Sequence, residues 1–178
     1  MPLEIISAIV EQCSISTTTN PSIKLVEAKN KSKPNTLSQV TIEKAHDSVW
    51  FSVDRKKKWS SYLADAQGIQ KRCDYVIINA VDGTTTILFV ELKSANIEKD
   101  ELYEKFRAKE CFIDYCDSIA RKFFGRSITK GCKKRFVVFY LAPSIAKTPT
   151  RPITSNYDRP NNPRYFPNPN RPKLKQLI

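Results

Sequence analysis

Two apolar segments, residues 73–79 and 85–93, flank the dipeptide Asp82-Gly83. Asp-Gly is a favoured centre for a two-residue type I′ turn, because both central positions need a positive φ. The pattern therefore predicts a β-hairpin. Both strands are apolar on both faces at their centres, so we expect the hairpin to be central in a sheet and covered on both sides.

The turn also predicts which residues lie opposite one another. If Val81 pairs with Thr84, the same register places Asp74 opposite Glu91. Directly opposed Cβ atoms in such a ladder lie about 4.5–5.5 Å apart. Lys93 follows Glu91 by two residues, so its side chain leaves on the same face of the strand. The sequence thus predicts two carboxylates and one lysine at the same end of the hairpin.

Two carboxylates at this spacing repel each other and resist transfer out of water. A divalent cation compensates for this most directly, because Mg²⁺ prefers oxygen ligands; Mn²⁺ is the other candidate. Lys93 can orient a water molecule or stabilise charge in a transition state. We interpret Asp74, Glu91 and Lys93 as a catalytic site for phosphodiester hydrolysis, with Asp74 and Glu91 as the metal ligands. The competing interpretation is a solvated Glu–Lys pair at a strand end.

The remaining periodicity predicts further elements around the hairpin. We expect a helix within residues 3–13, short strands near 23–28 and 49–53, and a strand over 134–142. We expect a long helix, capped by Asn96 and ended by Gly125, with an apolar stripe formed by Leu102, Phe106, Ile113, Cys116, Ile119 or Ala120, and Phe123. The core order is helix, three strands, helix, strand. This order predicts an α/β (α+β) fold with helices flanking a central mixed β-sheet.

The end of the chain differs in composition. Residues 147–178 hold seven of the 11 prolines, seven basic residues and one acidic residue. We therefore expect a domain over residues 1–146 and a basic, proline-rich tail over 147–178 without regular structure of its own.

The charge balance indicates polyanionic partners. Thirty Lys and Arg residues against 18 Asp and Glu give a formal net charge of +12. Candidate nucleic-acid contacts are Arg55, Lys56, Lys57, Lys58, Lys133, Lys134 and Arg135, although a solvated basic surface explains them equally well. The tail interleaves Tyr157, Tyr165 and Phe166 with Arg159 and Arg164, which suits either unpaired bases or packing on the domain.

The chain carries five cysteines, an odd number, and no CxxC pair. This pattern argues against a zinc site and against a disulfide framework. The start of the chain lacks the basic region of a secretory signal, and no apolar run is long enough to span a membrane. We therefore expect a cytoplasmic protein without a membrane partner.

The motifs Cys73-Asp74 and Glu91-Leu92-Lys93, together with the element order, resemble the PD-(D/E)XK, or restriction-endonuclease-like, nuclease superfamily over about residues 40–142. The segments reading CDY and ELK also resemble small bacterial nuclease-like proteins. The resemblance implies an αβββαβ core, Mg²⁺ bound by Asp74 and Glu91, and a catalytic role for Lys93.

The chain departs from the superfamily pattern at three points. Cys73 stands where many members have Pro, and the following helix lacks the Gln of some branches. Many members also use a further upstream acid. The candidates here are Glu4, Glu11, Glu27 and Glu43, and we favour Glu43 because it is closest to the first core strand.

These observations predict a metal-dependent endo- or exonuclease, and the resemblance implies DNA in preference to RNA as its substrate. The alternative is an inactive module of the same fold that binds nucleic acid or a partner protein in a larger assembly, for example in antiviral defence. A Holliday-junction resolvase, which would need a homodimer, is a third possibility.

Overall fold

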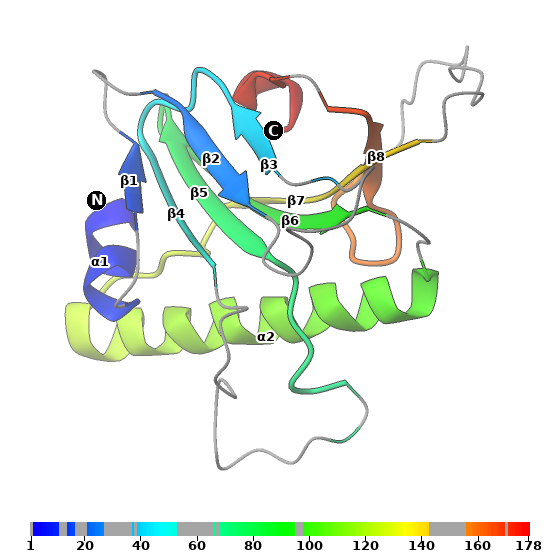
Figure 1. Cartoon of the computed structure of the whole chain (residues 1–178). Helices are drawn as coiled ribbons and strands as arrows, with labels where there is room; N and C mark the ends of the chain where they lie inside the picture. The colour runs from blue at the N-terminus through cyan, green and yellow to red at the C-terminus, as the bar shows by residue number, and fades with distance from the viewer. Residues whose placement is uncertain are drawn as a thin grey trace.

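The computed structural model describes residues 2–10, 14–16, 21–26, 37, 39–52, 66, 68–94, 98–142, 156–169 and 171–178. Within them lies a six-stranded sheet of order β1-β4-β5-β6-β7-β8, with a separate two-stranded sheet of β2 and β3 (Figure 1). The elements are α1 (Pro2–Ile9), β1 (Ser14–Ser16), β2 (Ile23–Val26), β3 (Gln39–Ile42), β4 (Ser48–Ser52), β5 (Tyr75–Val81), β6 (Thr84–Lys93), α2 (Lys99–Phe124), β7 (Lys133–Tyr140), β8 (Arg164–Pro167) and the 3₁₀ turn η1 (Leu174–Gln176).

The central hairpin is formed by β5 and β6. Their register runs from Val81↔Thr84 to Tyr75↔Val90, as the turn predicts. Asp82 and Gly83 have φ values of 50° and 73°, and two positive φ values in succession are the signature of a type I′ turn. The predicted turn and register are therefore confirmed, although β5 begins at Tyr75 rather than at residue 73.

The main sheet is mixed. Strands β4, β5 and β6 are antiparallel neighbours, whereas β7 runs parallel to β6 on its other side. The chain crosses from β6 to β7 through α2, which is the connection that a parallel pair requires. The structure is thus a mixed α/β fold in the expected order, with β1, β2, β3 and β8 added to it.

Both faces of the hairpin are covered, as expected. Val76, Ile78, Ile87 and Phe89 join a buried cluster with α1 and α2. The opposite face of the same strands packs against β2, β3 and the buried side chains of the chain end, including Leu174. The two α-helices therefore share one face of the sheet, and the small sheet replaces a helix on the other face (Figure 1). The expectation of flanking helices is met on one face only, because Ile23–Val26 and Gln39–Ile42 alternate between buried and more exposed side chains, as strands do.

Helix α2 runs along the sheet between two defined ends. Glu98 is the N-cap, whereas the predicted cap Asn96 lies outside the described residues. Gly125 ends the helix in the left-handed conformation, as predicted. The apolar stripe is buried from Leu102 to Ala120, but Phe123 is 79% exposed, so its assignment to the core is wrong. Periodicity gives the direction of a helix face but not the point where the surface it packs against ends.

The end of the chain is part of the fold. Strand β8 lies parallel to β7, from Val137↔Arg164 to Tyr140↔Pro167, and Leu174 and Leu177 are buried. The prediction of a tail without regular structure is therefore wrong for the described part of residues 147–178, while the proposed boundary after residue 146 lies outside the described residues. Prolines are tolerated here because β8 is an edge strand, in which one side of the backbone needs no ladder partner.

The Tyr75 side chain makes a hydrogen-bonded link between the small sheet and the main one. The Tyr75 hydroxyl accepts a hydrogen bond from Val26 N at 2.9 Å and donates one to Val26 O at 2.8 Å. Cys73, Cys111, Cys116 and Cys132 are free thiols. None of the helices in the described residues is both long and apolar enough to cross a membrane.

Candidate active site

Asp74 and Glu91 meet at the open end of the hairpin, one step beyond the last ladder pair. The Oδ2 atom of Asp74 accepts the backbone N–H of Leu92 at 2.7 Å. The Oε2 atom of Glu91 accepts the backbone N–H of Asp74 at 3.2 Å. Each carboxylate therefore extends the ladder by binding a backbone donor of the opposite strand. The structure brings the two predicted acids together in this way.

Two ammonium groups neutralise Glu91, which is only 1% exposed. Its Oε1 atom lies 3.3 Å from Lys93 Nζ and 2.6 Å from Lys105 Nζ. Glu101 of α2 contacts the same two lysines, at 3.9 Å and 3.2 Å. The buried charge that a cation was expected to balance is thus already balanced by side chains, one from β6 and one from α2.

The electrostatics of the cluster favour the charged forms of Lys105 and Glu101. Burial lowers the pKa of Lys105, but the charge of Glu91 and the hydrogen bond to it act more strongly in the other direction, so the pKa is raised overall. Burial raises the pKa of Glu101, but the neighbouring Lys105 and Lys93 bring it below its usual value. Lys105 and Glu101 are therefore both charged at neutral pH.

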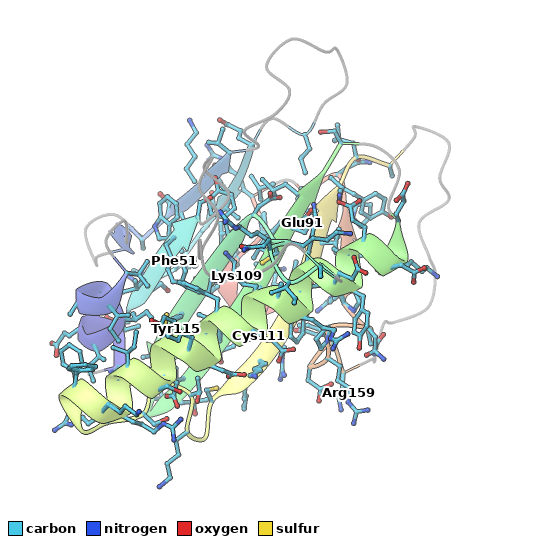
Figure 2. The ribbon with its side chains drawn as sticks, turned by 90° about the horizontal axis from the view of Figure 1, so that it is seen from below. Phe51, Glu91, Lys109, Cys111, Tyr115 and Arg159 are labelled. Atoms are coloured by element: carbon cyan, nitrogen blue, oxygen red, sulfur yellow. The ribbon has the colours of Figure 1, made fainter. Side chains whose placement is uncertain are left out.

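Cys73 and Lys109 lie in the buried region behind the site. Burial raises the pKa of the Cys73 thiol to about 12, with the charge of Lys109 opposing the shift, so Cys73 is a neutral packing residue and not a nucleophile. Lys109 is 2% exposed, and its Nζ lies 5.7 Å from the centre of the Phe112 ring. Figure 2 shows Glu91 and Lys109 between α2 and the sheet.

Sequence reasoning missed the contribution of α2. Glu101, Lys105 and Lys109 follow one another at i, i+4 spacing, so they share one side of the helix. Lys109 also falls at a stripe position, three residues after Phe106 and four before Ile113. A lysine within an apolar stripe could have indicated that α2 contributes to a charged site, because a buried ammonium group requires compensation from its surroundings.

The donor set is compatible with a magnesium ion but does not enclose one. Within the described part of the chain, no three His, Cys, Asp or Glu side chains gather into a metal-binding group. Mg²⁺ keeps several water ligands and is commonly held by one or two carboxylates together with substrate phosphate. Asp74 and Glu91 supply such a carboxylate pair, and a cation bound there would replace Lys105 as the partner of Glu91 Oε1.

The structure does not bring the favoured third acid to this site. Glu43 Oε1 lies 3.4 Å from Nη1 of Arg171, and its backbone bonds to Pro172 and Leu174. It serves the contact between β3 and the end of the chain. Glu11 and Glu27 lie outside the described residues, and Glu4 is an exposed residue of α1.

The basic candidates that the structure describes lie along β7. Residues 55–58 are outside the described part of the chain. Lys133, Lys134 and Arg135 begin β7, whose Tyr140 is the partner of Lys93. Glu91 is the partner of Val138, so Arg135 and Lys133 lie three and five residues from it along the strand, about 10 and 17 Å. Lys134 pairs with Glu110 at 2.9 Å, and Arg135 lies over the Tyr157 ring.

No protein-family model, curated protein or solved structure matches this chain.

Proposed function

We propose that this protein is a metal-dependent nuclease of the PD-(D/E)XK, restriction-endonuclease-like type, acting on DNA in preference to RNA. The observation that carries the proposal is the interlocked Asp74–Glu91 pair, with Lys93 and Lys105 at the same carboxylate. Paired acids beside a lysine at the end of a hairpin are the arrangement that the motif resemblance implies.

The order of the elements is also consistent with the proposal. Apart from β1, β2 and β3, which lie between α1 and β4 in the sequence, the order is α1, β4, β5, β6, α2 and β7, which is the order of an αβββαβ core. Placement of both helices on one face is a feature that the resemblance does not imply.

The residues divide into metal-holding and charge-stabilising groups. Asp74 and Glu91 would hold Mg²⁺ or Mn²⁺, which when bound would lower the pKa of a water ligand and polarise a phosphate oxygen. Lys93 and Lys105 place two positive charges beside the carboxylates, where they can stabilise negative charge that develops on a phosphate. Glu101 holds both lysines in this position.

A second candidate is a non-catalytic module that binds nucleic acid or a partner protein. The observation that favours it is the neutralisation of Glu91 by two ammonium groups, which leaves the cluster stable without a cation.

The test is a cleavage assay on plasmid, single-stranded DNA and RNA with Mg²⁺, Mn²⁺ or EDTA. We expect cleavage that requires the metal and falls roughly 100-fold or more in Glu91→Gln and Lys93→Met, since each removes a group from the reacting centre. Glu110→Gln is the matched control for Glu91, because Glu110 also accepts a lysine ammonium group but pairs with Lys134 of β7 and not with Lys93 or Lys105. Lys122→Met, in the exposed last turn of α2, is the control for Lys93.

Cleavage that ignores EDTA, or that survives both site substitutions, would contradict the proposal. Binding of substrate without cleavage in either metal would favour the non-catalytic module.

A further inference from the structure

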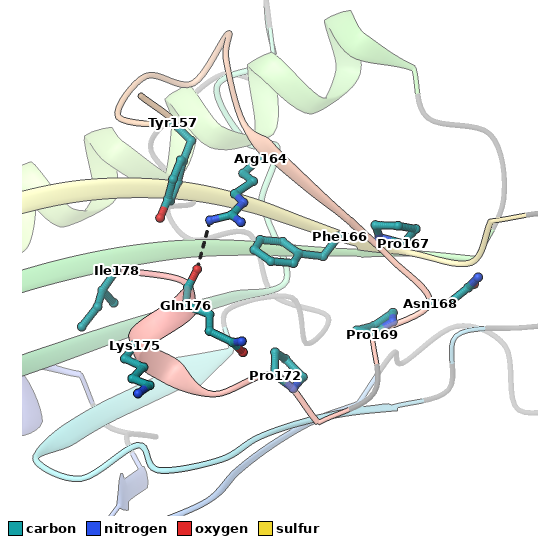
Figure 3. Close-up of a pocket in the computed structure, with 10 residues that line it drawn as sticks. All are labelled: Tyr157, Arg164, Phe166, Pro167, Asn168, Pro169, Pro172, Lys175, Gln176 and Ile178. Atoms are coloured by element: carbon teal, nitrogen blue, oxygen red, sulfur yellow. Dashed lines mark hydrogen bonds between the residues drawn. The ribbon is translucent and has the colours of Figure 1, made fainter. Parts of the chain in front are cut away.

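A second concave surface lies beside β8 (Figure 3). It is a cavity of about 520 Å³, and we call it the C-terminal pocket. The lining residues that matter here are Tyr157, Arg164, Phe166, Pro172, Lys175 and Gln176. A volume of this order is that of an ordinary small-molecule pocket.

The C-terminal pocket is separate from the candidate active site. Arg164 and Phe166 are the β8 partners of Val137 and Phe139, which belong to the buried cluster on the β2–β3 side of the sheet. Glu91 contacts Lys105 of α2 and therefore lies on the opposite face. The two sites share the sheet but present different surfaces.

Planar cationic and aromatic groups alternate in this pocket. The Arg164 guanidinium lies 4.5 Å from the centre of the Phe166 ring and 5.4 Å from that of Tyr157. Arg135 lies 5.2 Å from the same Tyr157 ring. Arg164 also donates one hydrogen bond, from Nη1 to the backbone oxygen of Gln176 at 3.1 Å. These contacts fix the orientation of the guanidinium plane.

The charge of the pocket is positive. Of the residues that line it, Arg164 and Lys175 are basic and none is Asp or Glu. Among the described residues, no Asp or Glu side chain forms an ion pair with Arg164 or Lys175. A guanidinium has five N–H donors, and the Gln176 contact uses one of them. The pocket therefore offers cationic donors to a ligand that brings its own negative charge.

We propose that the C-terminal pocket binds a nucleotide unit of a single-stranded nucleic acid. A base would stack on the planar row formed by Arg164 and Phe166, and Arg164 and Lys175 would contact the phosphate. Flat aromatic and guanidinium faces accept any base, while the cations follow the backbone. The combination of both features in one acid-free pocket distinguishes it from a merely basic surface.

A proline-rich peptide is the main competing ligand, because aromatic grooves also bind such segments. Here the prolines belong to the pocket itself, as Pro172 does, and the positive charge of Arg164 and Lys175 favours an anionic ligand. Peptide binding without oligonucleotide binding would overturn the proposal.

The test measures fluorescence anisotropy of labelled ten-nucleotide dT and rU oligomers with the full chain in EDTA. Stacking of a base is lost with Arg164→Ala, so we expect affinity to fall roughly tenfold or more. Lys175→Ala should weaken binding several-fold, since it removes a phosphate contact. The affinity of Arg164→Lys should lie between those of wild type and Arg164→Ala, because lysine keeps the charge but not the planar group. Lys122→Ala, an exposed lysine of α2, is the charge-matched control and should bind as wild type does.

An abasic oligomer of the same length separates stacking from simple charge attraction. We expect it to bind the wild type at least several-fold more weakly than dT. Equal binding of the abasic oligomer, or equal affinities of Lys175→Ala, Arg164→Lys and Lys122→Ala, would overturn the proposal even if Arg164→Ala failed to fold. The assay contains EDTA and measures binding alone, so binding at this pocket can fail or succeed independently of metal-dependent cleavage.

Discussion

At the scale of the residue, Glu91 governs the candidate site. A buried carboxylate with both oxygens bound is held in one orientation, and here the partners are the Asp74 backbone N–H, Lys93 and Lys105. Removing one partner of a buried pair leaves an uncompensated charge. Lys105 is therefore as much a part of the site as the residues of the hairpin motif.

Lys105→Met should lower the free energy of unfolding by about 1–3 kcal/mol at pH 7, because a charged hydrogen bond to Glu91 is lost while Lys93 remains. The pKa of Lys105 is higher in the folded protein than in the unfolded chain. The stabilisation that Lys105 provides is therefore fully present at any pH below its unfolded pKa, and it is lost only as pH rises through its folded pKa. Urea unfolding should thus show a constant difference in the free energy of unfolding between wild type and variant from pH 6 to 9. This difference should become smaller only at a higher pH.

The same variant reports on metal binding. Without the competing ammonium group, Mg²⁺ should raise the melting temperature of Lys105→Met more than that of wild type. Lys122→Met serves as the control. Equal shifts in all three proteins would argue against a cation at Glu91.

At the scale of the element, Asp117 connects α2 to β7. One oxygen, Oδ1, accepts hydrogen bonds from the Ser127 hydroxyl at 2.6 Å and from the backbone N–H groups of Ile128 and Thr129 at 2.7 and 3.0 Å. These bonds form the turn that follows Gly125. They determine where the chain leaves the helix and enters the parallel strand beside β6.

Asp117→Asn should destabilise the protein by about 1–3 kcal/mol at pH 7, because the amide replaces a charged acceptor of three hydrogen bonds. Burial raises the pKa of Asp117, but the hydrogen bonds from residues 127–129 lower it by more. The pKa of Asp117 is therefore below its usual value. The stabilisation that Asp117 provides is therefore fully present at a pH above its unfolded pKa, about 3.9, and it is lost as pH falls through its folded pKa. Denaturant unfolding at pH 7 and below pH 3.9 measures this, with the exposed Asp114→Asn as control. The prediction would be contradicted if wild type and Asp117→Asn differed as much in free energy of unfolding at the lower pH as at pH 7.

Elements set by local chemistry could be predicted from the sequence, whereas those set by distant contacts could not. Asp82-Gly83 determines the turn and hence the Asp74–Glu91 placement, and Gly125 marks the end of α2. Lys105 reaches Glu91 only because α2 packs over β6, a relation that no short segment encodes. Strand β8 was missed because its partner β7 is distant in sequence and its prolines indicate irregular structure.

At the scale of the whole molecule, the end of the chain closes the structure. It adds β8 to the main sheet, and Lys173 bridges to Glu43 next to β3. Leu174 and Leu177 are 2% and 0% exposed within the cluster on that face. Residues 171–178 therefore join the two sheets and belong to the core.

Leu174→Ala should destabilise the protein by about 2–5 kcal/mol, because it removes buried methyl groups and leaves a cavity between the sheets. Ile178→Ala, at a residue that is 36% exposed, should change stability by much less. Urea unfolding followed by fluorescence and circular dichroism checks both. One shared transition is expected, and a near-neutral Leu174→Ala would contradict the inclusion of the chain end in the core.

The bond pair between Tyr75 and Val26 has a consequence for self-association. An unpaired strand edge is a template on which another molecule can add a strand. At the end of β2, both backbone groups of Val26 are occupied by one phenolic hydroxyl, which takes the place of a neighbouring strand. A residue of the central sheet thus blocks intermolecular β-pairing at this position.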